Sequence, residues 1–248
     1  MIFRRAALPT LGIAGTAGLW EAATRSGLVA TTDVPTLSST LAAVGDLLGS
    51  ETFWTAVGDT LRSWALGLLV SAAVAIPLGI AIGASDRAWR FVKVPVEALR
   101  PIPPIVILPL ALLVLSGGIE FKVFLIAQGA LWPLLIQTSY GVRDIDAVVL
   151  DTARSYRLDW WRRIVFVRLP AALPIVATAL RLAAVTAFAV SLVTELIGGA
   201  PGLGQLLTVA TSGNNLPRVY ALTLVAGLFG MLVAAVFGAL QRRVAETR

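Results

Sequence analysis

The chain has 248 residues, of which 57% are hydrophobic and only 14% are charged. Soluble globular domains are about 45–50% apolar and about 25% charged, so this composition favours a membrane protein. The sequence contains no cysteine and no histidine, which excludes disulfides, thiolate or imidazole metal ligands and the usual general base. We therefore expect no catalytic residues, no metal site and no covalent chemistry in this chain.

Six segments reach the length of about 20 mostly apolar residues that a bilayer-spanning helix needs. They cover residues 6–23, 57–84, 96–116, 123–142, 171–196 and 219–240. None of them alternates with the period of two that marks a transmembrane β-strand. The sequence therefore predicts an all-α polytopic membrane protein, in which residues 1–248 form a single transmembrane domain with six helices.

The first segment has a second interpretation. The start MIFRR followed by an apolar run also resembles a secretory signal peptide. Its removal would leave five spans and would place the two ends of the chain on opposite sides of the membrane.

The basic residues indicate the orientation of the spans. The chain has 20 Lys and Arg residues against 14 Asp and Glu residues. When the N-terminus is placed in the cytoplasm, most of the basic residues fall in cytoplasmic segments, which is the positive-inside pattern. We therefore expect both termini in the cytoplasm. We expect no nucleic-acid binding, because the basic charge follows topology rather than forming one face.

The connection between the first two spans, residues 24–56, is expected on the outer side. Val34-Pro35 is an extended dipeptide, and Thr36 or Ser38 can cap the helix that follows. We expect this helix to lie at the outer membrane interface.

The second and third spans contain residues that affect helix packing. Gly79 and Gly83 form a G-x-x-x-G pattern, which either permits close helix packing or arises by chance. Four prolines fall in the third span, namely Pro101, Pro103, Pro104 and Pro109. Prolines disrupt a helix, which lipid tolerates only where protein or water satisfies the backbone. The start of this span is therefore expected against protein or a cavity, or as an extended entry to a late-starting helix.

The long cytoplasmic connection covers residues 144–170. Asp144 or Asp146 can cap a first helix that ends near Arg157, and Asp159 can cap a second helix rich in large apolar residues. Such an amphipathic elbow suits either the docking of another protein or a position on the lipid surface.

The elbow resembles a known sequence pattern. DTA at 151–153, followed by VRLP at 167–170, resembles the EAA loop of ABC transporter permease subunits. Further segments are similar to permeases for sulfonates, taurine and nitrate, namely LRPIPPIVILPLALL (99–113), ALRLA (179–183), VTELIGG (193–199) and GLGQLL (202–207). The resemblance covers residues 34–243 and implies a type I ABC importer-like permease with a cytoplasmic coupling elbow.

In such permeases the elbow sits in a cleft of a cytoplasmic ATP-binding subunit, whose closure switches the pathway between inward and outward access. The residues that match this coupling region are Asp151, Thr152, Ala153, Ser155, Arg157, Trp160, Leu169 and Pro170. Thr152 replaces the commoner alanine of the family, and Arg157 stands where the family has glycine. An arginine disfavours the left-handed conformation that glycine allows, so we expect the bend to shift to Leu158-Asp159 or to adopt another geometry.

The chain cannot supply the ATPase itself. A P-loop needs a lysine directly after a glycine, and neither Lys93 nor Lys122 follows one. We therefore expect no cofactor in this chain, with ATP and Mg²⁺ bound by a separate ATP-binding subunit. The resemblance also implies a second permease copy in a homodimer, an external or periplasmic substrate-binding protein, and a place in the bilayer of the bacterial cytoplasmic (inner) membrane.

Two other functional classes are weighed against this importer. An ATPase-independent channel or solute pore is the alternative, although a channel has no need of a large docking elbow. An integral membrane enzyme is disfavoured by the missing histidine and cysteine and by the lack of paired carboxylates within the spans.

The candidate residues of the translocation pathway are Arg100, Pro103, Arg181 and Glu195. Ionisable groups in a membrane usually face protein or water. In the functional interpretation, Arg100 or Arg181 favours the small anions that the resemblance implies, such as sulfonates, taurine and nitrate. In the structural interpretation, Arg181 pairs with Glu195 or with backbone carbonyls, and Arg100 snorkels to the cytoplasmic surface. About 21 Å would separate Arg181 from Glu195 along one helix, so that pair would need another helix or protomer.

The segment GGAPGLGQLL, residues 198–207, contains a short G-x-G pattern. No strand precedes it and it lies on the outer side, so it is a weak candidate for phosphate binding. We expect a re-entrant or turning loop near the outer gate, where a substrate-delivery protein could contact it.

Overall fold

The computed structural model describes residues 2–246, with side chains from residue 11 onward. Within that range the chain is helical and contains no strand. The elements in chain order are α1 (Ile2–Arg25), α2 (Leu37–Leu48), α3 (Glu51–Gly83), α4 (Asp86–Leu99), α5 (Pro104–Leu115), α6 (Ile119–Arg143), α7 (Ala147–Ser155), α8 (Trp160–Arg163), the π-helical turn η1 (Ile164–Arg168), α9 (Leu169–Gly198), α10 (Leu203–Ser212) and α11 (Leu216–Glu246).

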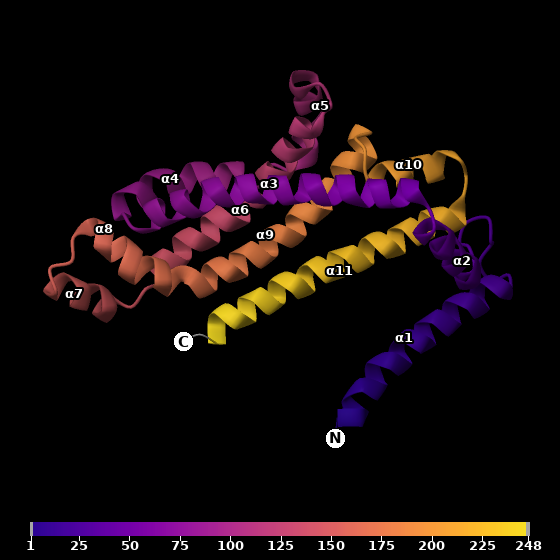
Figure 1. Ribbon diagram of the computed structural model, residues 1–248, viewed down its shortest axis with the longest axis horizontal. Helices are drawn as coiled ribbons and strands as arrows, with labels where there is room; N and C mark the ends of the chain where they lie inside the picture. The colour runs from indigo at the N-terminus through magenta and orange to yellow at the C-terminus, as the bar shows by residue number, and fades with distance from the viewer. Residues whose placement is uncertain (1, 247–248) are drawn as a thin grey trace.

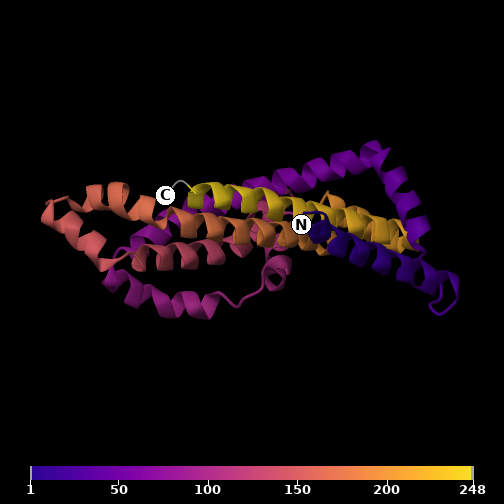
Figure 2. The same ribbon diagram turned by 90° about the horizontal axis from the view of Figure 1, so that it is seen from below.

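Long apolar helices form an elongated bundle (Figure 1). Within the described residues, four helices are long and apolar enough to cross a bilayer: α3, α6, the continuous helix Trp160–Gly198, and α11. They run along the long axis of the molecule (Figures 1 and 2), with α7 and α8 at one end and α2 and α10 at the other. We call these the elbow end and the far end. The four helices correspond to the predicted spans 57–84, 123–142, 171–196 and 219–240.

The core lies where α3, α6 and α9 pack together, and small residues make their approach close. A Cβ added to Gly79 would lie 2.7 Å from the Thr138 side chain on α6, and one added to Gly83 would lie 2.5 Å from the Ser139 carbonyl oxygen. The contribution of α9 is a set of fully buried alanines, Ala179, Ala183, Ala184 and Ala187. Since lipid is as apolar as a helix surface, close van der Waals packing drives helix association in membranes. The G-x-x-x-G pattern therefore serves helix packing.

The third predicted span, residues 96–116, is not a single helix. It is divided between α4 and α5, whose axes differ by 86°. Pro101 and Pro103 lie in the connection, residues 100–103, and α5 starts at Pro104. The proline rings and the missing N–H donors prevent a helix from continuing through this segment. This pair is one broken span or a re-entrant element, so the described chain has four continuous spans, or five with the pair.

The first predicted span, residues 6–23, lies within α1, but α1 is not among the helices that are apolar enough to cross a membrane. Its sequence includes Glu21 and several Gly and Thr residues, which lower its hydropathy. The all-α membrane fold is therefore confirmed. Of the six predicted spans, four are continuous apolar helices, the third is bent, and the first lies within α1, which does not reach the same hydropathy.

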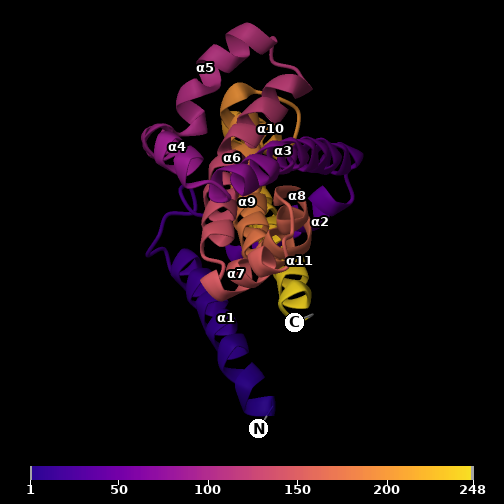
Figure 3. The ribbon, with the colours of Figure 1, turned by 90° about the vertical axis from the view of Figure 1, so that its left-hand side faces the viewer.

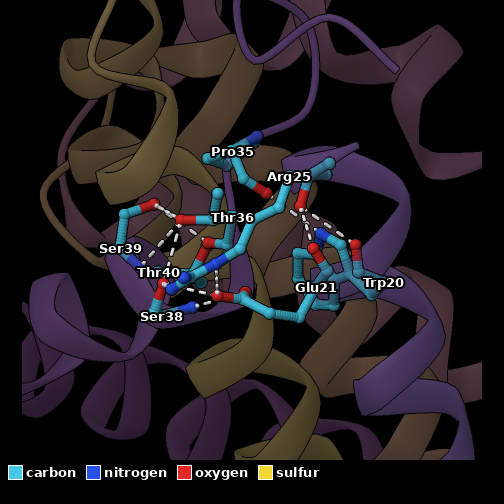
Figure 4. A network of polar contacts seen from close by, with 9 residues as sticks. Trp20, Glu21, Arg25, Pro35, Thr36, Ser38, Ser39 and Thr40 are labelled. Atoms are coloured by element: carbon cyan, nitrogen blue, oxygen red, sulfur yellow. Dashed lines mark hydrogen bonds and ion pairs between the residues drawn. The ribbon is translucent and has the colours of Figure 1, made fainter. Parts of the chain in front are cut away.

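The helix α1 diverges from the bundle (Figure 3), and side chains near its C-terminal end attach it to the segment around α2. The Trp20 indole N–H donates to the Pro35 carbonyl at 3.0 Å, and the Glu21 carboxylate accepts from the Ser38 hydroxyl at 2.8 Å (Figure 4). Thr36 caps α2 by accepting a backbone N–H of its first turn, which agrees with the predicted cap. These contacts hold α1 and α2 together at the far end.

The substitution Gly79→Val is expected to force α3 away from α6, because its side chain would overlap Thr138. Overpacking of this kind costs about 1–3 kcal/mol, so we expect the Tm of the detergent-solubilised protein to fall by roughly 5 °C. The control is Gly58→Val on the same helix, where an added Cβ meets nothing within 4 Å. Equal Tm values for the two variants would contradict the packing role.

Candidate functional site

The predicted elbow forms at the elbow end of the bundle. The Asp146 carboxylate accepts a backbone N–H of the first turn of α7 at 2.8 Å, so Asp146 rather than Asp144 is the cap. The Asp159 carboxylate caps α8 in the same way, also at 2.8 Å. The first helix ends at Ser155, and the second is a single turn that continues through η1 into α9.

The turn between α7 and α8 corrects one prediction. Arg157 has a φ of 52°, the left-handed conformation, so the bend does not shift to Leu158-Asp159. The Leu158 N–H donates to the Ala153 carbonyl at 3.2 Å, and the Arg157 N–H donates to the Arg154 carbonyl at 2.8 Å. These are the two bonds of a Schellman motif, which hold Arg157 in a conformation that costs a residue with a Cβ about 1–2 kcal/mol.

Several predicted coupling residues lie on α7 itself. Asp151 is exposed and forms an ion pair with Arg154 at 2.8 Å. The hydroxyls of Thr152 and Ser155 donate to carbonyls of the preceding turn of α7. Ala153 is buried. Of these residues, Asp151 is therefore the one that carries an exposed charge.

The remaining predicted coupling residues lie further along the chain. Trp160 is 59% exposed at the start of α8, whereas Leu169 and Pro170 begin α9. Two residues that the family resemblance does not identify, Val148 and Tyr156, are 70% and 79% exposed on and next to α7. Their large apolar side chains, set on a short amphipathic helix, are the signal by which the sequence could have identified them.

Two arginines tie the elbow end together. The Arg168 guanidinium donates to the Ala84 carbonyl, just after α3, at 2.7 Å. Arg143, at the last turn of α6, forms an ion pair with Asp86 of α4 at 2.9 Å and lies 5.2 Å from the centre of the Trp89 ring. The elbow is thus connected through η1 to both α9 and the end of α3.

Arg181 does not pair with Glu195, so this structural interpretation is wrong. The Arg181 guanidinium is exposed and donates to the Gln241 side-chain oxygen at 3.3 Å, and the Gln241 amide donates to the Thr178 hydroxyl at 3.0 Å. No carboxylate pairs with Arg181 in the part of the chain that the structure describes. Arg181 therefore presents an uncompensated positive charge between α9 and α11.

Arg100 and Pro103 lie together at the break between α4 and α5, and both are exposed. Arg100 lines a small cavity between α4 and α6 with Glu97 and Tyr140. The four candidate pathway residues are therefore not gathered in one site, because Arg181 and Glu195 lie at different levels of α9.

Glu195 lies at the centre of a buried polar cluster near the far end. Its carboxylate forms an ion pair with Lys122 of α6 at 2.8 Å, and the two side chains are 0% and 4% exposed. It also accepts the Thr60 hydroxyl of α3 at 2.9 Å and the Gly204 N–H of α10 at 3.0 Å. Lys122 donates to the Pro201 carbonyl at 2.6 Å. One cluster thus joins α3, α6, α9 and α10.

The GGAPGLGQLL segment forms the turn that brings α10 to this cluster. Gly202 has a φ of 150°, and an added Cβ would overlap the Glu195 carboxylate. Gly204 also has no room for a Cβ, since Glu195 lies against it. The two glycines let the first N–H groups of α10 reach buried acceptors. The predicted turning loop is therefore a tight turn followed by a helix.

Lys122 is the residue of this cluster that the sequence analysis does not identify as a candidate. The signal available was a lysine within the apolar run FKVFLIA, in a chain with only one other lysine. Its partner lies on a different helix, and the pairing depends on how α6 and α9 pack.

The variants Lys122→Met and Glu195→Gln test the buried ion pair. Each leaves a group without its partner, which for a buried ion pair costs about 3–5 kcal/mol, so we expect Tm to fall by roughly 10 °C. The double variant should be less destabilised than Lys122→Met alone, because no uncompensated charge remains. The control is Lys93→Met, which removes an exposed pair with Glu97 at 3.8 Å and should change Tm little. A Tm for Lys122→Met as high as that for Lys93→Met would refute this role.

Comparison with known proteins identifies the family. A family model described as "binding-protein-dependent transport system inner membrane component" matches residues 75–246. The chain is 29% identical over 230 residues to the putative aliphatic sulfonates transport permease protein SsuC of Bacillus subtilis (strain 168), covering 93% of this chain and 83% of that protein. It is 31% identical over 193 residues to the nitrate import permease protein NrtB of Leptolyngbya laminosa, covering 77% and 68%.

A solved structure shares the fold. The MetNI methionine ABC transporter in an inward-facing conformation has a TM-score of 0.71 at 20% identity, over 79% of this chain and 99% of that one. The match spans nearly the whole of the compared permease chain. The chain therefore belongs to the family of binding-protein-dependent transport system inner membrane components, and it is a permease subunit of an ABC importer.

Proposed function

We propose that two copies of this chain form the pathway by which a small anion, such as a sulfonate, taurine or nitrate, crosses the bacterial cytoplasmic membrane. The pathway opens alternately to the two sides as a separate ATP-binding subunit, docked on α7 in the cytoplasm, binds and hydrolyses ATP with Mg²⁺. A substrate-binding protein on the outer side delivers the anion. The two termini lie in the cytoplasm, and this chain catalyses no reaction.

The surface of α7 supports the docking of the ATP-binding subunit. Val148 and Tyr156 are exposed at the tip of the elbow, and Trp160 is exposed on the neighbouring turn. Apolar side chains on an exposed amphipathic helix are typical of a helix that inserts into a groove of a partner. In the alternative, in which the elbow lies on the lipid surface, the same side chains would insert into the membrane interface.

The connections of α7 supply the means of coupling. The chain continues from α7 through the Asp159-capped turn and η1 into α9, and Arg168 bonds the Ala84 carbonyl at the end of α3. A displacement of α7 is therefore transmitted to α9, which carries Arg181. This is a two-state element that a distant nucleotide can bias through its partner.

The exposed charge of Arg181 is the observation that carries the choice of an anion. A cation at membrane depth is tolerated where it faces a water-filled space, and it raises the local concentration of anions there. Gln241 orients the guanidinium at 3.3 Å without neutralising it. Two of the similar permeases are named for anionic substrates, namely aliphatic sulfonates and nitrate. Their names agree with this substrate class.

The far end offers a polar surface for a delivery protein. A hollow of about 370 Å³ lies between α2 and the start of α11, and it is lined by Asp46, Asn215 and Arg218 among others. Polar side chains of both signs around a concave surface favour a reversible contact with a soluble partner.

The substitution Val148→Asp is expected to release the ATP-binding subunit, because it places a charge in an apolar contact. We expect the P-loop protein that co-purifies with the tagged chain in mild detergent to fall at least tenfold. Leu28→Asp is the matched control, since Leu28 is also an exposed aliphatic residue and lies beside the far end. If the wild-type chain repeatedly purifies without a P-loop protein, the ATPase-independent channel becomes the better explanation.

The substitution Arg181→Gln is expected to lower uptake of labelled taurine and nitrate into proteoliposomes about tenfold, because the attractive charge is lost. Arg181→Lys should retain most of the activity of the wild-type complex. Arg87→Gln, which removes an exposed arginine from α4, is the control and should transport normally. Wild-type uptake by Arg181→Gln, at equal reconstitution, would eliminate Arg181 from the pathway.

A further inference from the structure

The short turns that join the elbow to α9 bring two arginines together at the elbow end (Figure 1). Arg163 is the last residue of α8, and Arg168 is the last residue of η1. Both side chains are partly buried, and they lie near enough for their charges to repel each other. We call Arg163 and Arg168 the arginine pair. Arg154 of α7 adds a third positive charge to the surroundings of Arg168.

The described residues do not neutralise the arginine pair. Asp151 forms an ion pair with Arg154 at 2.8 Å, and Asp86 forms one with an arginine of α6 at 2.9 Å. No ion pair joins Arg163 or Arg168 to a carboxylate in the described part of the chain. The Arg163 Nε atom is also buried there without a hydrogen-bond partner. Partly buried cations without a counter-charge are costly, so the arginine pair favours a bound anion.

The length of α9 places the arginine pair at the membrane surface. The helix has 30 residues, which correspond to about 45 Å. A bilayer with its headgroup regions is about 40–45 Å thick. When the far end of α9 lies at one surface of the membrane, Arg168, directly before α9, therefore lies among the headgroups of the opposite leaflet.

Apolar side chains adjoin the arginine pair along the same helix. Trp161 is 64% exposed, and tryptophan is enriched at the level of lipid headgroups. Phe166 lies in η1 and is 70% exposed, and Leu173, further along α9, is 45% exposed. The region thus combines two uncompensated cations with an apolar surface that leads into the bilayer. This combination suits an amphiphilic anion.

We propose that Arg163 and Arg168 bind the phosphate of an anionic phospholipid in the leaflet at the elbow end, and that its acyl chains lie against Phe166 and Leu173. Guanidinium groups bind phosphate oxygens through paired hydrogen bonds. Basic pockets at the ends of transmembrane helices are a recurring type of site for anionic lipid headgroups.

The bound lipid braces a junction between helices. Arg168 already donates to the Ala84 carbonyl, just after α3, at 2.7 Å. A guanidinium has five N–H donors, so the same side chain can bond the carbonyl and a phosphate together. The lipid therefore holds η1 beside α3, whereas α7 remains free for a protein partner. The two ligands of the elbow end occupy different segments.

Titration of the purified full chain with dioleoylphosphatidylglycerol tests this site, with the bound fraction measured by native mass spectrometry in mild detergent. We expect one tightly bound lipid on the wild type and at least tenfold weaker binding of dioleoylphosphatidylcholine. Arg163→Gln should weaken binding of the anionic lipid at least tenfold, and Arg163→Lys should retain part of the affinity. The matched control is Arg242→Gln, which removes an exposed arginine near the end of α11 and should bind like the wild type.

A second variant covers the case in which Arg163→Gln does not fold. Phe166→Ser keeps both arginines and should also weaken binding, because the acyl contact is lost. Wild-type affinity in both variants, or equal affinity for the two lipids, would overturn the lipid site.

Two further outcomes would assign the arginine pair to another anion. Displacement of the lipid by excess inorganic phosphate would indicate a site for free phosphate. Loss of the co-purifying P-loop protein from Arg163→Gln, with lipid binding unchanged, would indicate a carboxylate of the protein partner. Either result would overturn the lipid assignment, whereas the proposed transport function would be untouched by it.

Discussion

A polypeptide in a bilayer has to satisfy its own backbone N–H and C=O groups, because hydrocarbon offers no partner for them. The long helices α3, α6, α9 and α11 meet this requirement within themselves. Where the chain departs from a helix, side chains or a partner molecule must satisfy the backbone groups instead. The turn before α10 is the clearest case, since the Leu203 N–H donates to Thr60 at 2.9 Å and the Gly204 N–H donates to Glu195 at 3.0 Å.

The buried ion pair follows from that requirement. The Glu195 carboxylate lies at the start of α10, where the first backbone N–H groups have no carbonyl partner within the helix. It accepts the Gly204 N–H and complements the positive end of the helix dipole. A lone buried carboxylate would be costly, and Lys122 neutralises it while also bonding the Pro201 carbonyl. The glycines at 202 and 204 are then required by space rather than by phosphate binding, because Glu195 occupies the volume of their missing side chains.

Hydropathy predicts the long helices well, since the cost of exposing polar groups to lipid is a property of each segment alone. The caps at Thr36, Asp146 and Asp159 are likewise local, and the sequence contains them. The 86° bend between α4 and α5 cannot be predicted in the same way. The prolines predict that the helix breaks, but they do not predict the direction in which the chain continues.

The partners of charged residues depend on how helices pack, and so they escape prediction from the sequence. Glu195 pairs with Lys122 rather than Arg181, because the packing of α6 against α9 brings the two side chains to within 2.8 Å. Arg157 adopts the conformation expected of glycine because two backbone hydrogen bonds hold it there. A local preference of about 1–2 kcal/mol is overridden by the motif as a whole.

The two ends of the bundle are held by contacts of different strength. At the far end, the helices share a fully buried ion pair whose disruption would leave a charge in the protein interior. At the elbow end, the links are Arg143 with Asp86, Arg168 with a carbonyl and Arg181 with Gln241, all at least partly exposed to solvent, and solvent-screened pairs contribute little to stability. The polar links of the elbow end are therefore the weaker ones, and it is close packing at Gly79 and Gly83 that holds α3 against α6 there.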